Sequence, residues 1–370
     1  MIRENDIIAM FRKAFPHSGI GDDTAVVRHG GGDLLLASDA VVEGVHFRLD
    51  TSTPGQAVQK AVTSNVSDIF AMGGSPERIL LTAGLPEGAT REDVEGIIEG
   101  ASTACACYGI GLVGGDTVRS PGGYFFDVAI TGVVPEGCAV MRTGAEKGDL
   151  IVVSGPLGGS LAGLRILESF LADKSCDGAP GLSGELCGKR FMKNSKAEVS
   201  QLLSASRKLS LSMDEDDFRS LVTEFGIAEE STPTLRMIAH HIVPFASGLD
   251  NLPGREDITS MIDISDGLAR DLSTLCGESG TGAVIEMDKI PAAPEMNTIP
   301  GADVDFVDEM VLTSGEEYRL LFTLKSGCAD RLPDDMALIG RMTSASDGIR
   351  LVSRDGTIGD IPFEGYEHSF

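Results

Sequence analysis

Hydrophobic positions along the chain change their spacing several times, and each change predicts a different element. Residues 34–37 are apolar without interruption, which predicts a buried strand that ends at Asp39. From Gln56 onward the apolar positions recur every three or four residues, which predicts a helix that carries Asp68 on a second face. A further helix, which a capping box of Thr90 and Asp93 would begin, and a strand that ends at Val134 complete a predicted N-terminal α/β unit.

The second half of the chain returns to this alternation after a segment of another kind. Residues 150–153 are typical of a strand, and a helix through Leu171 follows them. Residues from about 172 to 233 are rich in Ser, Lys and Glu and lack the strand pattern, so they predict an inserted helical lobe, in which the apolar positions of residues 218–225 fit one amphipathic helix. Strands and helices alternate again from Met261, with one strand expected from Tyr318 to Leu324, and end in a hairpin that turns at residues 354–356.

The length of the chain favours two domains. Its 370 residues exceed what one core usually organises, and 42% of them are hydrophobic, which is enough to fill two cores. We therefore predict an α/β (α+β) fold with one domain at residues 1–140 and a second at residues 141–370, which contains the helical insertion.

The composition disfavours several classes of partner. A net charge of −26 disfavours a long phosphate backbone, which binds clustered Lys and Arg. There is no run of about 18 apolar residues, and the charged first six residues do not resemble a signal peptide. Seven cysteines without a Cys-x-x-Cys pair favour reduced thiols. We expect a cytoplasmic protein that binds neither nucleic acid nor membrane.

Several short segments place aspartates beside glycine or another small residue. Each of them alone is explained equally well by a turn or a helix N-cap. Together they supply hard oxygen donors on tight backbone, which is the chemistry that holds Mg²⁺ against polyphosphate, and buried carboxylates are costly unless a cation neutralises them. The segments are 19–23, 38–39, 65–68, 114–116 and 261–267.

Longer strings around these aspartates resemble a known family. The chain is similar to the thiamine-monophosphate kinases, in the superfamily of aminoimidazole ribonucleotide synthetase. The similar strings occur in the family's order and span the chain except for residues 172–260. They are GIGDDTAVV (19–27), SDAVVEGVHF (38–47), NVSDIFAMGG (65–74), GGDT (114–117), MRTGAEKGD (141–149), MIDISDGLARDL (261–272) and GYEH (365–368).

The resemblance implies ATP-dependent phosphorylation of thiamine monophosphate to thiamine diphosphate, by direct in-line transfer with several Mg²⁺ ions. It also implies a homodimer whose N-terminal domains bind ATP and metal and pair into a shared β-barrel. Asp116 and Asp263 would be catalytic, and Arg142, Ser265 and Gly115 would bind ATP. The metal ligands would be Asp23, Asp39, Asp68, Asp116, Asp263 and Asp266.

On the acceptor side the resemblance implies roles for His46, Glu316 and Phe363, the last as an aromatic face for the thiamine rings. A histidine beside a strand and a phenylalanine in a core are the structural alternatives. The chain departs from the family at residues 314–320, SGEEYRL in place of GGEDYEL, and at 243–247, VPFAS in place of RPxPR. Two other functions therefore stay open: a synthetase of the same superfamily with another acceptor, and a non-catalytic nucleotide-binding protein.

Overall fold

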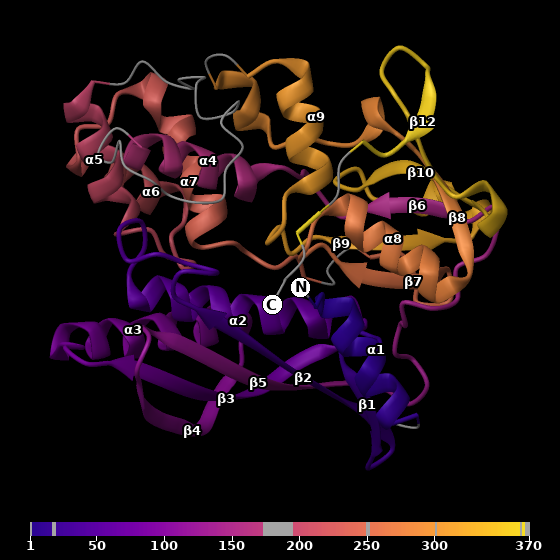
Figure 1. Cartoon of the computed structure of the whole chain (residues 1–370), viewed down its shortest axis with the longest axis horizontal. Coiled ribbons are helices and arrows are strands. Elements are labelled where there is room, and N and C mark those ends of the chain that lie inside the picture. The colour runs from indigo at the N-terminus through magenta and orange to yellow at the C-terminus, as the bar shows by residue number, and fades with distance from the viewer. Residues whose placement is uncertain are drawn as a thin grey trace.

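The computed structural model describes residues 2–16, 20–172, 195–248, 252–299, 302–362 and 365–366. Two units, each built on one sheet, lie against each other (Figure 1). The chain forms a mixed α/β structure, as predicted, and both of its sheets are mixed. No helix in the described ranges has the length and apolarity needed to cross a membrane.

The N-terminal unit is built on a five-stranded sheet in the order β1-β2-β5-β3-β4, in which only β3 and β4 are parallel. A short helix, α1 (Glu4–Ala14), precedes it. The predicted capping box at Thr90 is confirmed at the start of α3 (Arg91–Tyr108). The strands are β1 (Ala25–His29), β2 (Gly32–Val42), β3 (Ser75–Pro86), β4 (Gly111–Ser120) and β5 (Phe125–Pro135).

The C-terminal unit is built on a seven-stranded sheet in the order β12-β11-β8-β10-β6-β9-β7. The predicted terminal hairpin is confirmed by the antiparallel pairing of β11 and β12. The strands are β6 (Leu150–Val153), β7 (Ile258–Asp263), β8 (Thr281–Glu286), β9 (Leu320–Leu324), β10 (Ala337–Ser344), β11 (Ile349–Val352) and β12 (Ile358–Asp360). The helices beside it are α4 (Gly159–Ala172), α8 (Leu268–Ser279) and α9 (Val304–Thr313).

A group of helices follows α4 in the chain: α5 (Lys196–Ser206), α6 (Glu215–Glu224) and α7 (Thr232–Ile242). The predicted amphipathic helix around Phe218 corresponds to α6, in which Phe218 and Leu221 are buried. The insertion was predicted for residues 172–233, and 173–194 of these lie outside the described residues.

Helix α2 (Pro54–Ala71) runs between the two units (Figure 1). Its apolar residues pack on the N-terminal sheet, yet its polar positions are also buried, including Lys60, Asn65 and Ser67. The expectation of one apolar face and one polar face was therefore too simple. Lys60 and Ser67 bond to Glu316 and Asp263 of the second unit, so these side chains lie where the two units meet, whereas Asn65 accepts a hydrogen bond from Asp39 of β2.

Two strand ends differ from their predictions. Strand β2 continues past Asp39 to Val42, because its whole length pairs with β5. The strand predicted from Tyr318 begins only at Leu320, because Glu316 and Tyr318 have φ values of 55° and 50°. These left-handed conformations are uncommon outside glycine and interrupt an extended backbone.

Candidate active site

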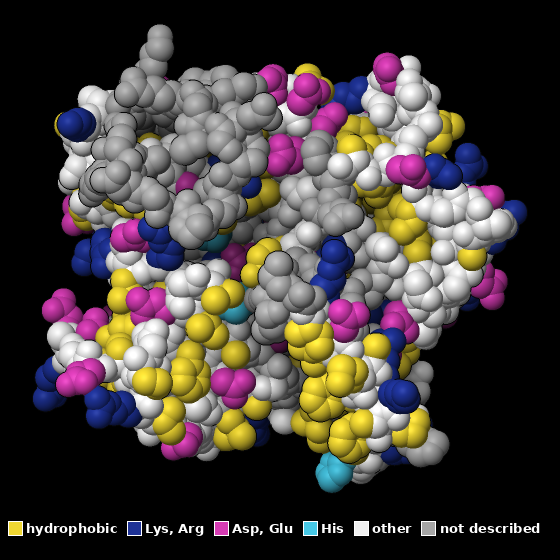
Figure 2. Space-filling model, viewed as in Figure 1, with side chains coloured by type: hydrophobic (Ala, Val, Ile, Leu, Met, Phe, Trp, Pro, Cys, Tyr) yellow, Lys and Arg dark blue, Asp and Glu magenta, His cyan; other side chains and the backbone are white. Residues whose placement is uncertain are grey.

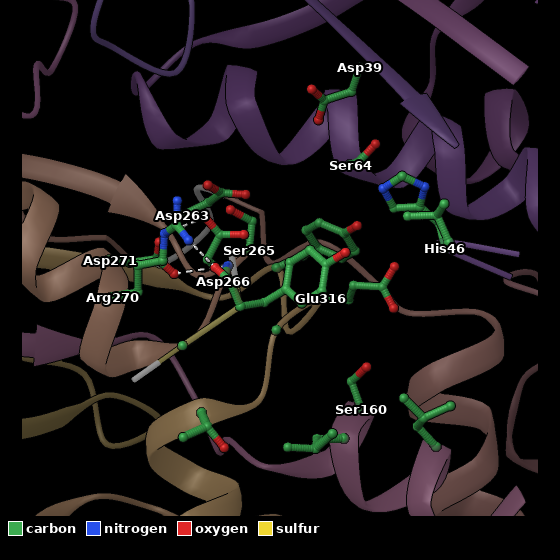
Figure 3. A pocket seen from close by; sticks show the side chains of 18 of the residues that line it. Asp39, His46, Ser64, Ser160, Asp263, Ser265, Asp266, Arg270, Asp271 and Glu316 are labelled. Carbon is green, nitrogen blue, oxygen red and sulfur yellow. Dashed lines mark hydrogen bonds and ion pairs between the residues drawn. The ribbon is translucent and has the colours of Figure 1, made fainter. Parts of the chain in front are cut away.

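A cleft of about 1120 Å³ lies between the two units. Strand β2 and helix α2 contribute Asp39, Ser64 and Asp68 from the N-terminal unit. The segment after β7 contributes Asp263 and Asp266 from the other unit (Figure 3). Side chains predicted from distant parts of the sequence therefore share one cavity.

Three aspartates form the most compact cluster in the cleft. Carboxylate oxygens of Asp23, Asp68 and Asp263 all lie within 4.8 Å of one another. Asp263 is the last residue of β7, Asp68 lies in the last turn of α2, and Asp23 precedes β1. Ser67 donates a 2.7 Å hydrogen bond to Asp263 Oδ2 and so fixes one of the three carboxylates.

The Asp23 side chain is fully buried, and its two oxygens differ in their partners. Oδ1 accepts a 2.6 Å hydrogen bond from Arg142. Oδ2 is buried and accepts no hydrogen bond from the described residues. Because a buried carboxylate oxygen without a partner is costly, this atom is a ready ligand for a cation.

The carboxylates of the cluster repel one another. Burial, and then the neighbouring carboxylates, raise the pKa of Asp68 and of Asp263 well above the ordinary value. The same causes raise the pKa of Asp39 to about 6. Among the described residues, no lysine or arginine forms an ion pair with any of these three. Hard oxygen ligands with excess negative charge fit Mg²⁺, which prefers carboxylates and water.

The segment after β7 is tightly organised at its turn into α8. Buried Asp271 accepts hydrogen bonds of 3.1 Å from the backbone N–H groups of Asp266 and Gly267. Arg270 pairs with Asp266 at 3.1 Å and with Glu4 of α1 at 3.4 Å. Asp271 was missed in the sequence, although a carboxylate inside an apolar helix pattern is the signal that had singled out Asp68.

Arg142 and Ser265 both line the cleft, where an ATP contact was predicted for them. The backbone N–H of Arg142 donates to Asp22 Oδ1 at 2.6 Å, so both adjacent aspartates, Asp22 and Asp23, hold this residue. The carbonyl of Ser265 accepts a 2.8 Å hydrogen bond from the backbone N–H of Glu316. Asp22 also lines the cleft and was not among the predicted residues.

The predicted acceptor-side residues His46 and Glu316 lie at another part of the same cleft (Figure 3). Lys60 Nζ lies 2.7 Å from Glu316 Oε2 and 3.2 Å from the carbonyl oxygen of His46. His241 Nδ1 lies 3.5 Å from Glu316 Oε2. Sequence reasoning missed Lys60 and His241, which meet Glu316 only through folding of segments far apart in the chain.

Two predicted residues, Asp116 and Gly115, are not brought to the cleft within this chain. Asp116 and Gly115 lie on the edge strand β4, where both are exposed. The strand registers place Asp116 on the face of the sheet opposite to Asp39. Gly115 approaches Leu81 so closely that a Cβ would lie 1.9 Å from its carbonyl oxygen, which explains the glycine by packing. Phe363 lies outside the described residues.

The sequence and the fold of this chain are similar to those of known proteins. The models for AIR synthase related protein match residues 21–134 with its N-terminal domain and residues 245–348 with its C-terminal domain. Thiamine-monophosphate kinase of Aquifex aeolicus is 30% identical over 321 residues, which cover 86% of this chain and 85% of that protein. The chain belongs to the thiamine-monophosphate kinase family. It is therefore a kinase, an enzyme that transfers a phosphoryl group.

Other members of the thiamine-monophosphate kinase family match over nearly the whole chain. The enzyme of Pyrococcus horikoshii is 28% identical over 369 residues, which cover 99% of this chain and 96% of that protein. The solved structure of AaThiL complexed with AMPPCP and TMP has a TM-score of 0.73 at 28% identity and covers 99% of this chain and 97% of that one.

The two departures from the thiamine-monophosphate kinase pattern lie against each other in space. Arg319 stands where the family has glutamate, and Ser247 stands where the family has arginine. In the structure Arg319 donates a 2.7 Å hydrogen bond to Ser247 Oγ.

Proposed function

We propose that this kinase transfers the γ-phosphoryl group of ATP to the phosphate of thiamine monophosphate, producing thiamine diphosphate. The proposal is supported by full-length similarity to thiamine-monophosphate kinases. The observation that carries it is the convergence of Asp23, Asp68 and Asp263, with an unpartnered buried oxygen, in a cleft between the two units.

We infer direct in-line transfer, in which the acceptor phosphate oxygen attacks the γ-phosphorus while the bond to the leaving ADP oxygen breaks. When bound, several Mg²⁺ ions would neutralise charge on the phosphate oxygens. Asp23, Asp68 and Asp263 would hold metal, and Asp39 and Asp266 would be further ligands from the same cleft. The chain's own contribution is then to position two substrates and to exclude water from the cleft.

The remaining predicted roles are assigned by place in the cleft. Arg142, fixed by Asp23, would bind ATP phosphates with its guanidinium, and Ser265 would bind ATP beside it. His46 and Glu316, at the other part of the cleft, would contact the acceptor. Phe363 is kept as the proposed stacking residue for the thiamine rings.

The test is incubation of the purified protein with MgATP and thiamine monophosphate, followed by chromatography. We expect thiamine diphosphate and ADP in equal amounts, and none when chelator replaces Mg²⁺. Tight binding of MgATP without this product would instead favour a relative with another acceptor. Absence of MgATP binding would contradict the kinase function itself.

We also propose a homodimer that forms through the outer face of the N-terminal sheet. Hydrophobic side chains gather over this unit, in the lower half of Figure 2. The strand registers place Leu80, Val118 and Val133 on one face of neighbouring strands, where they are 48%, 38% and 39% exposed. An uncovered apolar sheet face of this kind is typical of a subunit interface. Asp116 shares this face, so its proposed metal contact would involve the dimer interface.

For this interface we predict that Leu80→Asp converts a dimer to a monomer, because it buries a charge without a partner. Sedimentation velocity of the wild type and the variant measures the change. Val304→Asp is the matched control, since Val304 is 58% exposed on α9 of the other unit. A wild type that is monomeric at about 10 μM would contradict the proposal, because a stable dimer has a dissociation constant below that concentration.

A further inference from the structure

Lys60 is almost completely buried, with 2% of its side chain exposed, yet it lies one residue layer behind the cleft. Its Nζ contacts Glu316 Oε2 and the carbonyl oxygen of His46, and both of these residues line the cleft. A buried ammonium group is costly unless it is paired and hydrogen-bonded. Its position on α2, opposite a segment of the second unit, makes this an ion pair between the units.

Glu316 depends on Lys60 for its neutralising charge. His241 Nδ1 lies 3.5 Å from Glu316 Oε2 and 3.3 Å from Ser160 Oγ. Burial, and then the charge of Lys60, lower the pKa of His241 well below its ordinary value, so the imidazole is neutral. Among the described residues, Lys60 is therefore the charged partner of Glu316.

The geometry of these contacts leaves one oxygen of Glu316 for a ligand. Lys60 and His241 both approach Oε2, and no described protein group donates to Oε1. The backbone of Glu316 is held in its left-handed conformation by the hydrogen bond to the Ser265 carbonyl. Figure 3 shows the Glu316 carboxylate between His46 and Ser160, apart from Asp263 and Asp266.

We propose that Lys60 is a positioning residue, which fixes Glu316 Oε2 so that Oε1 faces the acceptor as a hydrogen-bond or ion-pair partner. This rests on the proposed function, because it assigns the Glu316 end of the cleft to the organic part of the acceptor. The group that Oε1 recognises is a cationic or amino-bearing ring. Lys60 itself does not touch the acceptor.

The test compares Lys60→Met, Glu316→Gln and the double variant. Each is expected to raise KM for thiamine monophosphate about tenfold, with KM for MgATP changed less than about twofold, because binding is lost at one end of the cleft. The double variant should be no worse than Glu316→Gln alone, since Lys60 acts only through Glu316. It also carries no unpaired buried charge, so it keeps the comparison available if Lys60→Met does not fold.

Arg255→Met is the matched control for loss of a contact between the units. Arg255 donates hydrogen bonds of 2.8 Å to the carbonyls of Cys138 and Ala139, away from the cleft. Neither KM should change in this variant. A parallel rise of both constants in Lys60→Met, or a double variant clearly worse than Glu316→Gln, would overturn the positioning role.

Melting temperatures separate this outcome from failure of the proposed function. Thiamine monophosphate should raise the melting temperature of the wild type and have little effect on Lys60→Met or Glu316→Gln, while MgATP stabilises all three. A wild type that is stabilised by both ligands but forms no thiamine diphosphate refutes the transfer reaction and leaves the positioning role supported. Equal stabilisation of all three by thiamine monophosphate refutes the positioning role.

Discussion

Asp68→Asn is expected to lower turnover by about two to three orders of magnitude, the scale on which loss of one preorganised electrostatic group acts. It should also raise the melting temperature of the metal-free protein. Burial, and then repulsion from Asp39, Asp263 and Asp23, raise the pKa of Asp68, so a neutral amide there removes a destabilising charge that a proton or a bound cation otherwise neutralises. Activity and stability therefore move in opposite directions.

Steady-state kinetics and thermal unfolding in chelator measure the two effects. Asp216→Asn is the control, because Asp216 is exposed on α6 and its carboxylate pairs, within the described part of the chain, only with Arg219 at 3.4 Å. That variant should match the wild type in both measurements. Unchanged turnover in Asp68→Asn, or a lower melting temperature without metal, would show that Asp68 is a structural residue.

The second large effect is that the stability of the metal-free protein is expected to fall as pH rises. The carboxyl groups of Asp39, Asp68, Asp263 and Asp271 have pKa values raised by burial and by one another, that of Asp39 to about 6. A group that binds its proton more tightly when folded contributes stability at low pH and loses it as pH rises through the folded pKa. The metal-free protein should therefore lose stability between about pH 4 and about pH 7.

Mg²⁺ should reverse this trend, because its ligands must be deprotonated. We expect its stabilising effect to grow as pH rises through about 6, to several degrees in melting temperature. Thermal unfolding with Mg²⁺ and with chelator, across this range, measures it. High salt screens surface repulsion but not the buried cluster, so the trend should persist in about 0.5 M NaCl. A Mg²⁺ effect independent of pH would contradict the cluster as the metal site.

Much of the fold follows from local sequence patterns. The capping box at Thr90, the apolar spacing of α2 and the terminal hairpin are each set by residues close together in the chain, and all three are confirmed. The end of β2 was not predictable in this way. The strand continues through Asp39 because β5 pairs with it, and that partner lies far along the chain.

The residues of the candidate site also fall into those that local sequence predicts and those that it does not. Aspartates beside small residues could be recognised locally, and three of them converge. Lys60 and His241 could not be recognised in this way. From the sequence alone, a lysine in an apolar helix is expected to be solvated, and the carboxylate partner of Lys60 lies 256 residues away in the chain. Asp116 shows the other limit, since a motif does not reveal which face of a sheet its side chain occupies.

The single helix α2 carries both Lys60 and Asp68. At about 1.5 Å per residue, these eight steps separate them by about 12 Å along a rigid axis. The helix thus fixes the distance between the aspartate cluster and Glu316. An acceptor must therefore have the length that places its phosphate at the aspartates and its far end at Glu316. Inserting one residue into α2 between Lys60 and Asp68 would rotate one of these side chains by about 100° about the helix axis relative to the other. The two ends of the site would then no longer face the same cleft.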